Sequence, residues 1–140
     1  MATTVVNAIG LAWESEDIPG VDDLYMRVHQ SQIDETGAPF PGAFKDRDGG
    51  MSTDWNKYSI PEETRSRGKN PKENAVISMN VDKVRRIPGQ VVNHTPSIEF
   101  NNRAHTDVIG DKKNNPEVRV LFGRIYNLVI PYSKERKVAE

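Results

Sequence analysis

The chain has 140 residues, no cysteine, and 19 basic against 20 acidic side chains. Its length suits one domain, the missing cysteine excludes disulfides and thiolate chemistry, and the near-neutral charge argues against a dedicated nucleic-acid binder. No apolar run approaches the ~20 residues of a membrane span, and no signal peptide precedes the acidic segment 14–17. We therefore predict one soluble, cytoplasmic domain over residues 1–140, with a frayed tail from about residue 133.

The charge is unevenly distributed along the chain. Residues 1–60 carry 10 acids and 4 bases, whereas residues 61–140 carry 10 acids and 15 bases. The basic half is suited to an anionic ligand. The alternative is that the two halves pack together and mix their charges on one surface.

The first part of the chain predicts a segment whose type stays open, then a strand and a long loop. Segment 3–13 is apolar and fits a strand or a helix before the break at 18–20. Segment 24–30 alternates, with Leu24, Met26 and Val28 on one face, which predicts a strand. Segment 32–54 is rich in Gly, Pro and Asp, and such a long irregular stretch is typical of a functional or mobile loop.

The middle of the chain predicts two short helices around a strand. Ser59 is a candidate helix cap and Pro61 suits a first turn, so we expect a helix to about Arg67. Alternation predicts a strand over 75–81. One or two helical turns over 81–87 follow.

The last third predicts extended segments over 90–94, 103–109 and 117–130, the last of them bent at Gly123. Predicted strands thus outnumber predicted helices, and the helices are short. The expected fold class is α+β, a curved, mostly antiparallel sheet with a few short flanking helices.

A polar block from His94 to Asp107 holds two of the three histidines. In an extended chain Arg103, His105 and Asp107 share a face. A carboxylate that orients a histidine supports its use as a general base, so His105 and Asp107 are candidate catalytic residues and Arg103 is a candidate ligand-binding residue. The alternative is a surface strand edge with a hydrogen-bonded histidine. Metal binding is a lesser alternative, and no metal site is predicted because the spacing matches no known ligand pattern.

A second group of candidates is suited to an anion. Arg27 and His29 share one face of the predicted strand at 24–30, Ser52 and Thr53 follow a glycine pair, and Tyr58 lies beyond. Arginine offers a planar fork of donors for phosphate or carboxylate, and hydroxyls beside a glycine turn complete such a cradle. We predict all five as ligand-binding residues. The alternative is a solvent-exposed strand face beside an ordinary turn.

Four short motifs carry a resemblance to known proteins: Leu24-Tyr25-x-Arg27-Val28-His29, Ala43-Phe44, Met51-Ser52-x-Asp54-Trp55 and Asn102-Arg103-Ala104-His105. Their pattern resembles small uncharacterised bacterial and phage proteins, and their order is similar to that of the ADP-ribosyltransferase-like fold, which includes compact toxin domains. The resemblance implies NAD or another nucleotide as ligand or cofactor. Arg27 would hold the phosphate or ribose, and Ser52-Thr53 would be the serine–threonine step of a later strand.

The chain departs from this family at its end. Family members usually place a catalytic glutamate on a late strand, and the late candidates here, Glu99 and Glu117, stand in no recognised motif. Whether the chain is an enzyme therefore stays open.

Three hypotheses follow from the sequence. The first is a small nucleotide-binding domain, with ADP-ribosyltransferase-like activity on NAD or a nucleotide as its enzymatic form. It requires Arg27 and His105 to lie on the same side of the sheet. The second is a non-catalytic accessory protein that captures a small anionic ligand or a protein partner, or that forms a homo-oligomer. RNA binding through the basic clusters at 65–72 and 83–86 ranks third.

Overall fold

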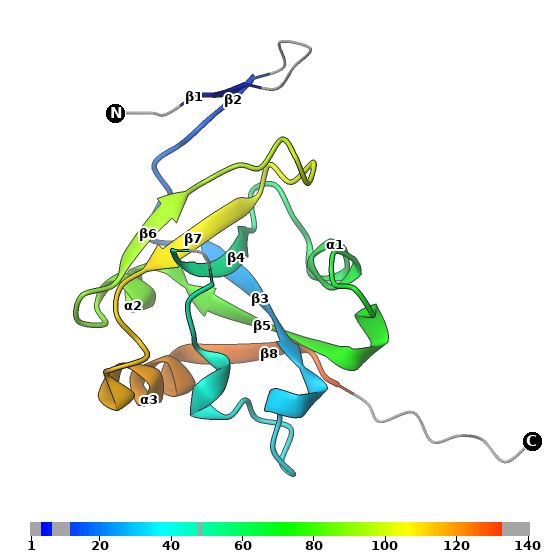
Figure 1. Cartoon of the computed structure of the whole chain (residues 1–140), viewed down its shortest axis with the longest axis vertical. Coiled ribbons are helices and arrows are strands. Elements are labelled where there is room, and N and C mark those ends of the chain that lie inside the picture. Colours follow the sequence, from blue (N-terminus) through cyan, green and yellow to red (C-terminus); the bar gives the residue numbers. More distant parts are fainter. Residues whose placement is uncertain (1–3, 7–11, 48, 133–140) are drawn as a thin grey trace, which may run out of the picture.

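The computed structural model describes residues 4–6, 12–47 and 49–132 (Figure 1). Within them the strands are β1 (Thr4–Val6), β2 (Ala12–Glu14), β3 (Asp23–His29), β4 (Met51–Trp55), β5 (Asn74–Asn80), β6 (Val91–His94), β7 (His105–Ile109) and β8 (Tyr126–Ile130). The α-helices are α1 (Pro61–Ser66), α2 (Val81–Arg85) and α3 (Pro116–Ile125), and short 3-10 helices are η1 (Gln30–Gln32), η2 (Pro41–Ala43) and η3 (Pro71–Glu73).

One antiparallel sheet organises the chain. Its strand order is β6-β7-β4-β3-β5-β8, while β1 and β2 pair separately. Helix α1 contacts β3 and β5, whereas α2 contacts β5, β6 and α3. The three helices are thus divided between the two faces of the sheet, with α1 on one and α2 and α3 on the other (Figure 1). The expected α+β class, with short helices beside a mostly antiparallel sheet, is confirmed.

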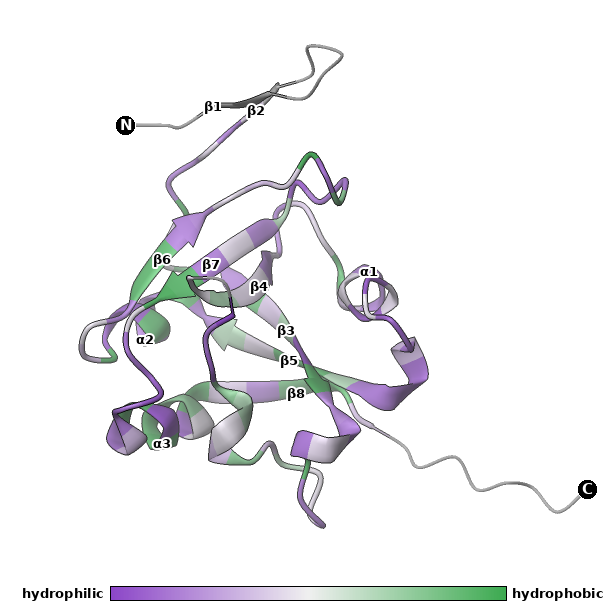
Figure 2. Ribbon diagram, in the orientation of Figure 1, coloured by the Kyte–Doolittle hydropathy of each residue, from purple (hydrophilic) through white to green (hydrophobic). Residues whose placement is uncertain are grey.

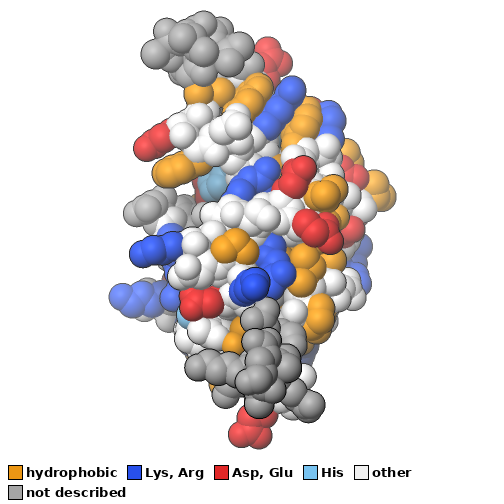
Figure 3. All heavy atoms as spheres, turned by 90° about the vertical axis from the view of Figure 1, so that its right-hand side faces the viewer, with side chains coloured by type: hydrophobic (Ala, Val, Ile, Leu, Met, Phe, Trp, Pro, Cys, Tyr) orange, Lys and Arg blue, Asp and Glu red, His pale blue; other side chains and the backbone are white. Residues whose placement is uncertain are grey.

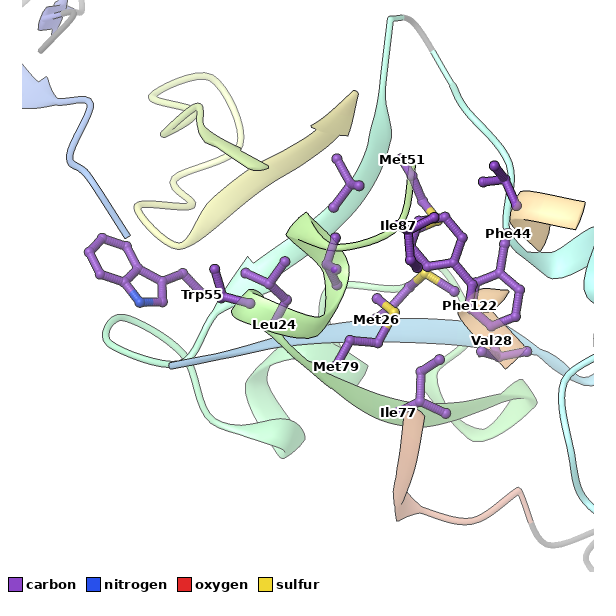
Figure 4. Close-up of a cluster of buried hydrophobic side chains, with 14 of the residues drawn as sticks. Leu24, Met26, Val28, Phe44, Met51, Trp55, Ile77, Met79, Ile87 and Phe122 are labelled. Carbon is purple, nitrogen blue, oxygen red and sulfur yellow. The ribbon is translucent and has the colours of Figure 1, made fainter. Parts of the chain in front are cut away.

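The face that carries α2 and α3 holds the hydrophobic core. Leu24, Met26 and Val28 of β3 point into it from alternate positions (Figure 4). Phe44 and Phe122 stack at one end, with ring centroids 5.3 Å apart. In Figure 2 the hydrophobic colour marks α2 and stretches of the strands, whereas α1 and the segment after it are largely hydrophilic.

The opposite face of the sheet is polar. Antiparallel pairing sets Ser52 of β4 opposite Asp107 of β7, and Asp54 opposite both His105 and Tyr25. Directly opposed residues project to the same side of a sheet. The register therefore brings polar side chains from three strands to the face on which α1 lies.

Most predicted elements are found where the sequence placed them, including the strand at 24–30, the helix from Pro61 and the short helix after 81. The doubtful segment 3–13 contains β1 and the start of β2, and its central residues lie outside the described part of the chain, as does the predicted frayed tail. Among the described residues, no helix has the length and apolar character needed to span a membrane.

Three expectations about the elements before and after the middle of the chain were wrong. Segment 117–130 is not extended throughout, because α3 occupies most of it before β8. Pro116 stands in the first turn and the Asn115 side chain caps the Val118 amide, so this sequence starts a helix. The irregular stretch 32–54 ends early, in β4. Ser59 is not the cap of α1, since Ile60 takes that position with no side-chain cap.

Candidate functional site

Two adjoining hollows open on the polar face of the sheet. They have volumes of about 500 and 600 Å³ and share Arg27, Arg47, Ser52 and Arg67 in their linings. We call the two together the arginine cleft. The first hollow extends toward η1 and the segment after α1, and the second extends toward β7 and the loop 97–102. Figure 3 shows the side of the molecule that carries α1, where Lys and Arg side chains recur with acidic side chains between them.

Each wall of the arginine cleft has its own structural origin. β3 supplies Arg27, β4 supplies Ser52, and β7 supplies His105. Arg47 precedes a tight turn closed by mutual backbone hydrogen bonds between Arg47 and Gly50. Gly49 has a φ of 96°, a left-handed conformation that glycine adopts without strain.

The buried carboxylate of Asp54 holds together the elements around the arginine cleft. Asp54 is 2% exposed. Its Oδ2 accepts hydrogen bonds from Thr64 Oγ1 at 2.7 Å and Arg67 Nη1 at 2.8 Å. Its Oδ1 accepts one from Asn102 Nδ2 at 2.8 Å. A buried charge needs such partners, and these bonds join α1 and the loop 97–102 to the sheet.

The arginines of the cleft differ in their charge balance. Arg67 pairs with Asp54 and, at 3.8 Å, with Glu63. Arg27 donates to the Thr64 carbonyl at 2.8 Å, and within the described residues neither Arg27 nor Arg47 forms an ion pair. Burial lowers the pKa of Arg27, whereas the negative charge of Asp54 raises it. An arginine stays charged nonetheless, so the described residues that line the cleft carry more positive than negative charge.

His105 is oriented by Thr95. Its Nδ1 lies 3.0 Å from the Thr95 carbonyl oxygen and 2.9 Å from Thr95 Oγ1, and its Nε2 lies 3.4 Å from Ser52 Oγ. Asp107 Oδ1 is 3.9 Å from the same Nε2, and Asp107 Oδ2 accepts a hydrogen bond from the Thr95 hydroxyl at 3.0 Å. The sequence predicted that Asp107 would orient the ring. The structure instead places Asp107 opposite Ser52, and the carbonyl and hydroxyl of Thr95 orient the ring.

The structure brings together only some of the predicted site residues. Arg27, Ser52, His105 and Asp107 line one hollow, which meets the condition that Arg27 and His105 share a side of the sheet. Thr53 borders this hollow, but its buried hydroxyl donates to the Thr106 carbonyl at 2.8 Å.

His29 lines the other hollow, where its Nε2 lies 3.5 Å from Glu73.

Tyr58 and Arg103 lie outside the arginine cleft. The Arg103 guanidinium stands over the Tyr58 ring at 4.3 Å from its centroid, and Tyr58 stacks on His94. The predicted common face of Arg103 and His105 is wrong, because β7 begins only at His105 and Arg103 belongs to the preceding turn.

Sequence reasoning missed several residues of the cleft, among them Arg47, Arg67 and Phe100. Phe100 is 76% exposed at the tip of the loop 97–102 and borders the second hollow together with Tyr25. No motif in the sequence links these positions. The late acidic candidates do not join them, since neither Glu99 nor Glu117 borders the arginine cleft.

The described residues contain no group of three His, Cys, Asp or Glu side chains that could hold a metal ion. Both nitrogens of His94 are already engaged, Nδ1 by the Glu16 amide at 3.0 Å and Nε2 by the Arg103 carbonyl at 2.7 Å. His94 is therefore a structural histidine in this fold, separate from the His105 group.

Comparison with known proteins gives no further guide to function. No family model matches the chain, and neither a curated protein nor a solved structure matches it. The resemblance to ADP-ribosyltransferase-like proteins therefore stays a prediction from the sequence.

Proposed function

We propose that the arginine cleft binds a phosphate-bearing ligand of nucleotide size, with NAD among the candidates. The observation that carries this proposal is the position of Arg27 and Arg47 in both hollows, without an ion pair among the described residues. Guanidinium groups recognise phosphate with paired hydrogen bonds. Lys45 and Lys69 line the first hollow, against one acid, Glu73.

Aromatic side chains favour a nucleotide over a bare anion. Tyr25 and Phe100 border the second hollow, next to the arginines that line both. Nucleobases stack on aromatic rings. A base beside Phe100 and a phosphate group over Arg27 and Arg47 would fill both parts of the arginine cleft, and the volumes of about 500 and 600 Å³ are adequate for such a ligand.

Binding is the function that the geometry supports best, ahead of ADP-ribosyl transfer. The acids that border the cleft are Glu73, Asp54 and Asp107. Asp54 is committed to Thr64, Arg67 and Asn102. An ADP-ribosyltransferase-like enzyme or toxin would need one of the other two to replace the missing late glutamate. The absence of cysteine suits a reducing compartment, and the cytoplasm stays the predicted location.

The test is calorimetric titration of the purified chain with pyrophosphate, ATP, NAD and ADP-ribose. Arg27→Met and Arg47→Met should each weaken binding about tenfold or more, since a charge-assisted hydrogen bond contributes roughly 1.5–3 kcal/mol. Arg86→Met is the matched control, because Arg86 is exposed beside α2 and borders neither hollow.

Absence of binding by the wild-type chain would overturn the proposal. If light scattering then showed a homo-oligomer, or if a protein partner were captured, the alternative of a non-catalytic accessory protein would take its place. Binding of RNA that Arg86→Met weakened as strongly as Arg47→Met would favour the RNA hypothesis.

A further inference from the structure

Ser52 and His105 are diagonal neighbours on adjacent strands of the arginine cleft. β4 and β7 pair so that Ser52 lies opposite Asp107 and Asp54 opposite His105. The Ser52 hydroxyl oxygen is 3.4 Å from His105 Nε2, and Ser52 is exposed to solvent. Catalytic hydrogen bonds are often this long before a substrate binds. The hydroxyl is thus accessible to a ligand and within reach of a base.

The backbone determines which nitrogen of His105 carries its proton. Nδ1 lies 3.0 Å from the Thr95 carbonyl oxygen and 2.9 Å from the Thr95 hydroxyl oxygen. A carbonyl oxygen can only accept a hydrogen bond, and the Thr95 hydroxyl already donates its proton to Asp107. Both contacts therefore favour a proton on Nδ1 of the neutral ring. The lone pair then lies on Nε2, the atom that faces Ser52. This is the tautomer in which an imidazole accepts a proton from a serine.

Asp107 lies beside the same ring. Its Oδ1 is 3.9 Å from Nε2, and its Oδ2 accepts a hydrogen bond from the Thr95 hydroxyl at 3.0 Å. Thr95 therefore contacts the histidine with its backbone carbonyl and its hydroxyl, and the aspartate with the same hydroxyl.

We propose that Ser52 is a nucleophile toward phosphorus, with His105 as its general base, in a phosphate ester held by Arg27 and Arg47. The identity of the substrate rests on the proposed function. As the Ser52 Oγ–P bond forms, the hydroxyl proton passes to His105 Nε2, and the P–O bond to the leaving group breaks with its electron pair on that oxygen. The leaving oxygen takes the proton from Nε2 and departs as an alcohol. Water then gives a proton to Nε2 and attacks the phosphorus of the phosphoserine. The Ser52 Oγ–P bond breaks, Ser52 Oγ takes the proton from Nε2, and phosphate is released.

The chain contains its own comparison for this assignment. Ser31 Oγ lies 2.8 Å from His29 Nδ1 on the exposed surface of the first hollow. That nitrogen also accepts the Ser31 backbone N–H, at 3.2 Å, so its lone pair is already engaged. A nearby histidine is therefore not enough, and Ser31 should be much less reactive than Ser52.

The experiment is labelling with an alkyl fluorophosphonate, in which the serine oxygen displaces fluoride from phosphorus. Peptide mass spectrometry should find the adduct on Ser52 and not on Ser31. His105→Gln, whose amide can still donate to the Thr95 carbonyl, should slow labelling roughly 100-fold or more, the scale of a lost general base. Ser52→Ala should abolish it. Circular dichroism of each variant verifies that the fold persists.

Wild-type chain that is not labelled at Ser52, or His105→Gln that is labelled at the wild-type rate, would overturn the assignment. Pyrophosphate titration of the wild-type chain separates the two proposals. Binding without His105-dependent labelling refutes the nucleophile alone, and labelling without anion binding refutes the proposed phosphate ligand.

Discussion

His94 Nδ1 accepts a hydrogen bond from the backbone N–H of Glu16 at 3.0 Å, across 78 residues of sequence. His94 is 2% exposed, and its Nε2 donates to the Arg103 carbonyl at 2.7 Å. The Ser15 hydroxyl adds a bond to the His94 carbonyl at 2.6 Å. A neutral imidazole thus attaches the segment that follows β2 to β6.

This attachment should weaken in acid. Burial lowers the pKa of His94, with Arg103 and His105 lowering it further against opposition from Glu16 and the Arg103 carbonyl. The unfolded chain therefore takes up the proton first, at the ordinary histidine pKa of about 6.5. The stability contributed by neutral His94 is full above that pH and is lost as pH falls toward the lowered value in the folded state.

Urea denaturation at several pH values measures this effect. His94→Gln has no titrating ring, so its free energy of unfolding should fall less steeply between pH 7 and pH 5 than that of the wild-type chain. The protection factor of the Glu16 amide against hydrogen exchange should also fall in acid more than that of the Met26 amide in β3. Equal slopes for the two proteins would contradict the role given to His94.

Removing the buried carboxylate should unfold the site. Asp54→Ala removes the acceptor that Thr64, Arg67 and Asn102 share, and breaking a buried ion pair from one side costs about 3 kcal/mol or more. Glu62→Gln on exposed α1 is the control, with an expected change within about 0.5 kcal/mol. Chemical denaturation of both variants measures the difference, and similar values would show that the network contributes little.

Phe100→Ala should distinguish a nucleobase from a phosphate. The ring is 76% exposed, so its removal should leave the melting temperature nearly unchanged. Affinity for ATP should fall by roughly 1–3 kcal/mol, the usual value of base stacking, while affinity for pyrophosphate stays constant. Val21→Ala, at an 82% exposed position away from the arginine cleft, is the control. Equal losses for both ligands would place the base elsewhere.

The interior face of α3 should be far less tolerant than its outer face. Phe122→Ala removes a fully buried ring stacked on Phe44, and such truncations cost about 3–5 kcal/mol. Val120→Ala, 43% exposed on the same helix, should cost less than about 1 kcal/mol. Thermal denaturation compares the pair. Equal costs would mean that 117–130 is extended after all, as the sequence first indicated.

The sequence revealed most strands by their alternation. β3 has one apolar face and one polar face, and its pattern is evident in Leu24, Met26 and Val28. The strand over 75–81 was predicted as well, although β5 has α1 on one face and the core on the other, so its residues from Asn74 to Met79 are all buried. In α3, Val118 and Phe122 are four residues apart and both buried. The intervening Val120 made this helical spacing resemble strand alternation.

The site was predictable only in part for a related reason. Arg27, Ser52 and His105 each stood out by residue type, but their meeting depends on the strand order β7-β4-β3, which no local pattern contains. Arg47 and Arg67 carry no signal of their own in the sequence. Tyr58 and Arg103 stood out equally and belong to a different cluster around His94.

The two oxygens of Asp54 serve opposite walls of the arginine cleft. Oδ2 holds α1 through Thr64 and Arg67, and Oδ1 holds the loop 97–102 through Asn102. A carboxylate is one rigid plane, so a ligand that pulls Arg67 also displaces the acceptor of Asn102. The loop that carries Phe100 and the helix α1 are thereby held by one side chain, and we expect a displacement of either to be transmitted to the other through Asp54.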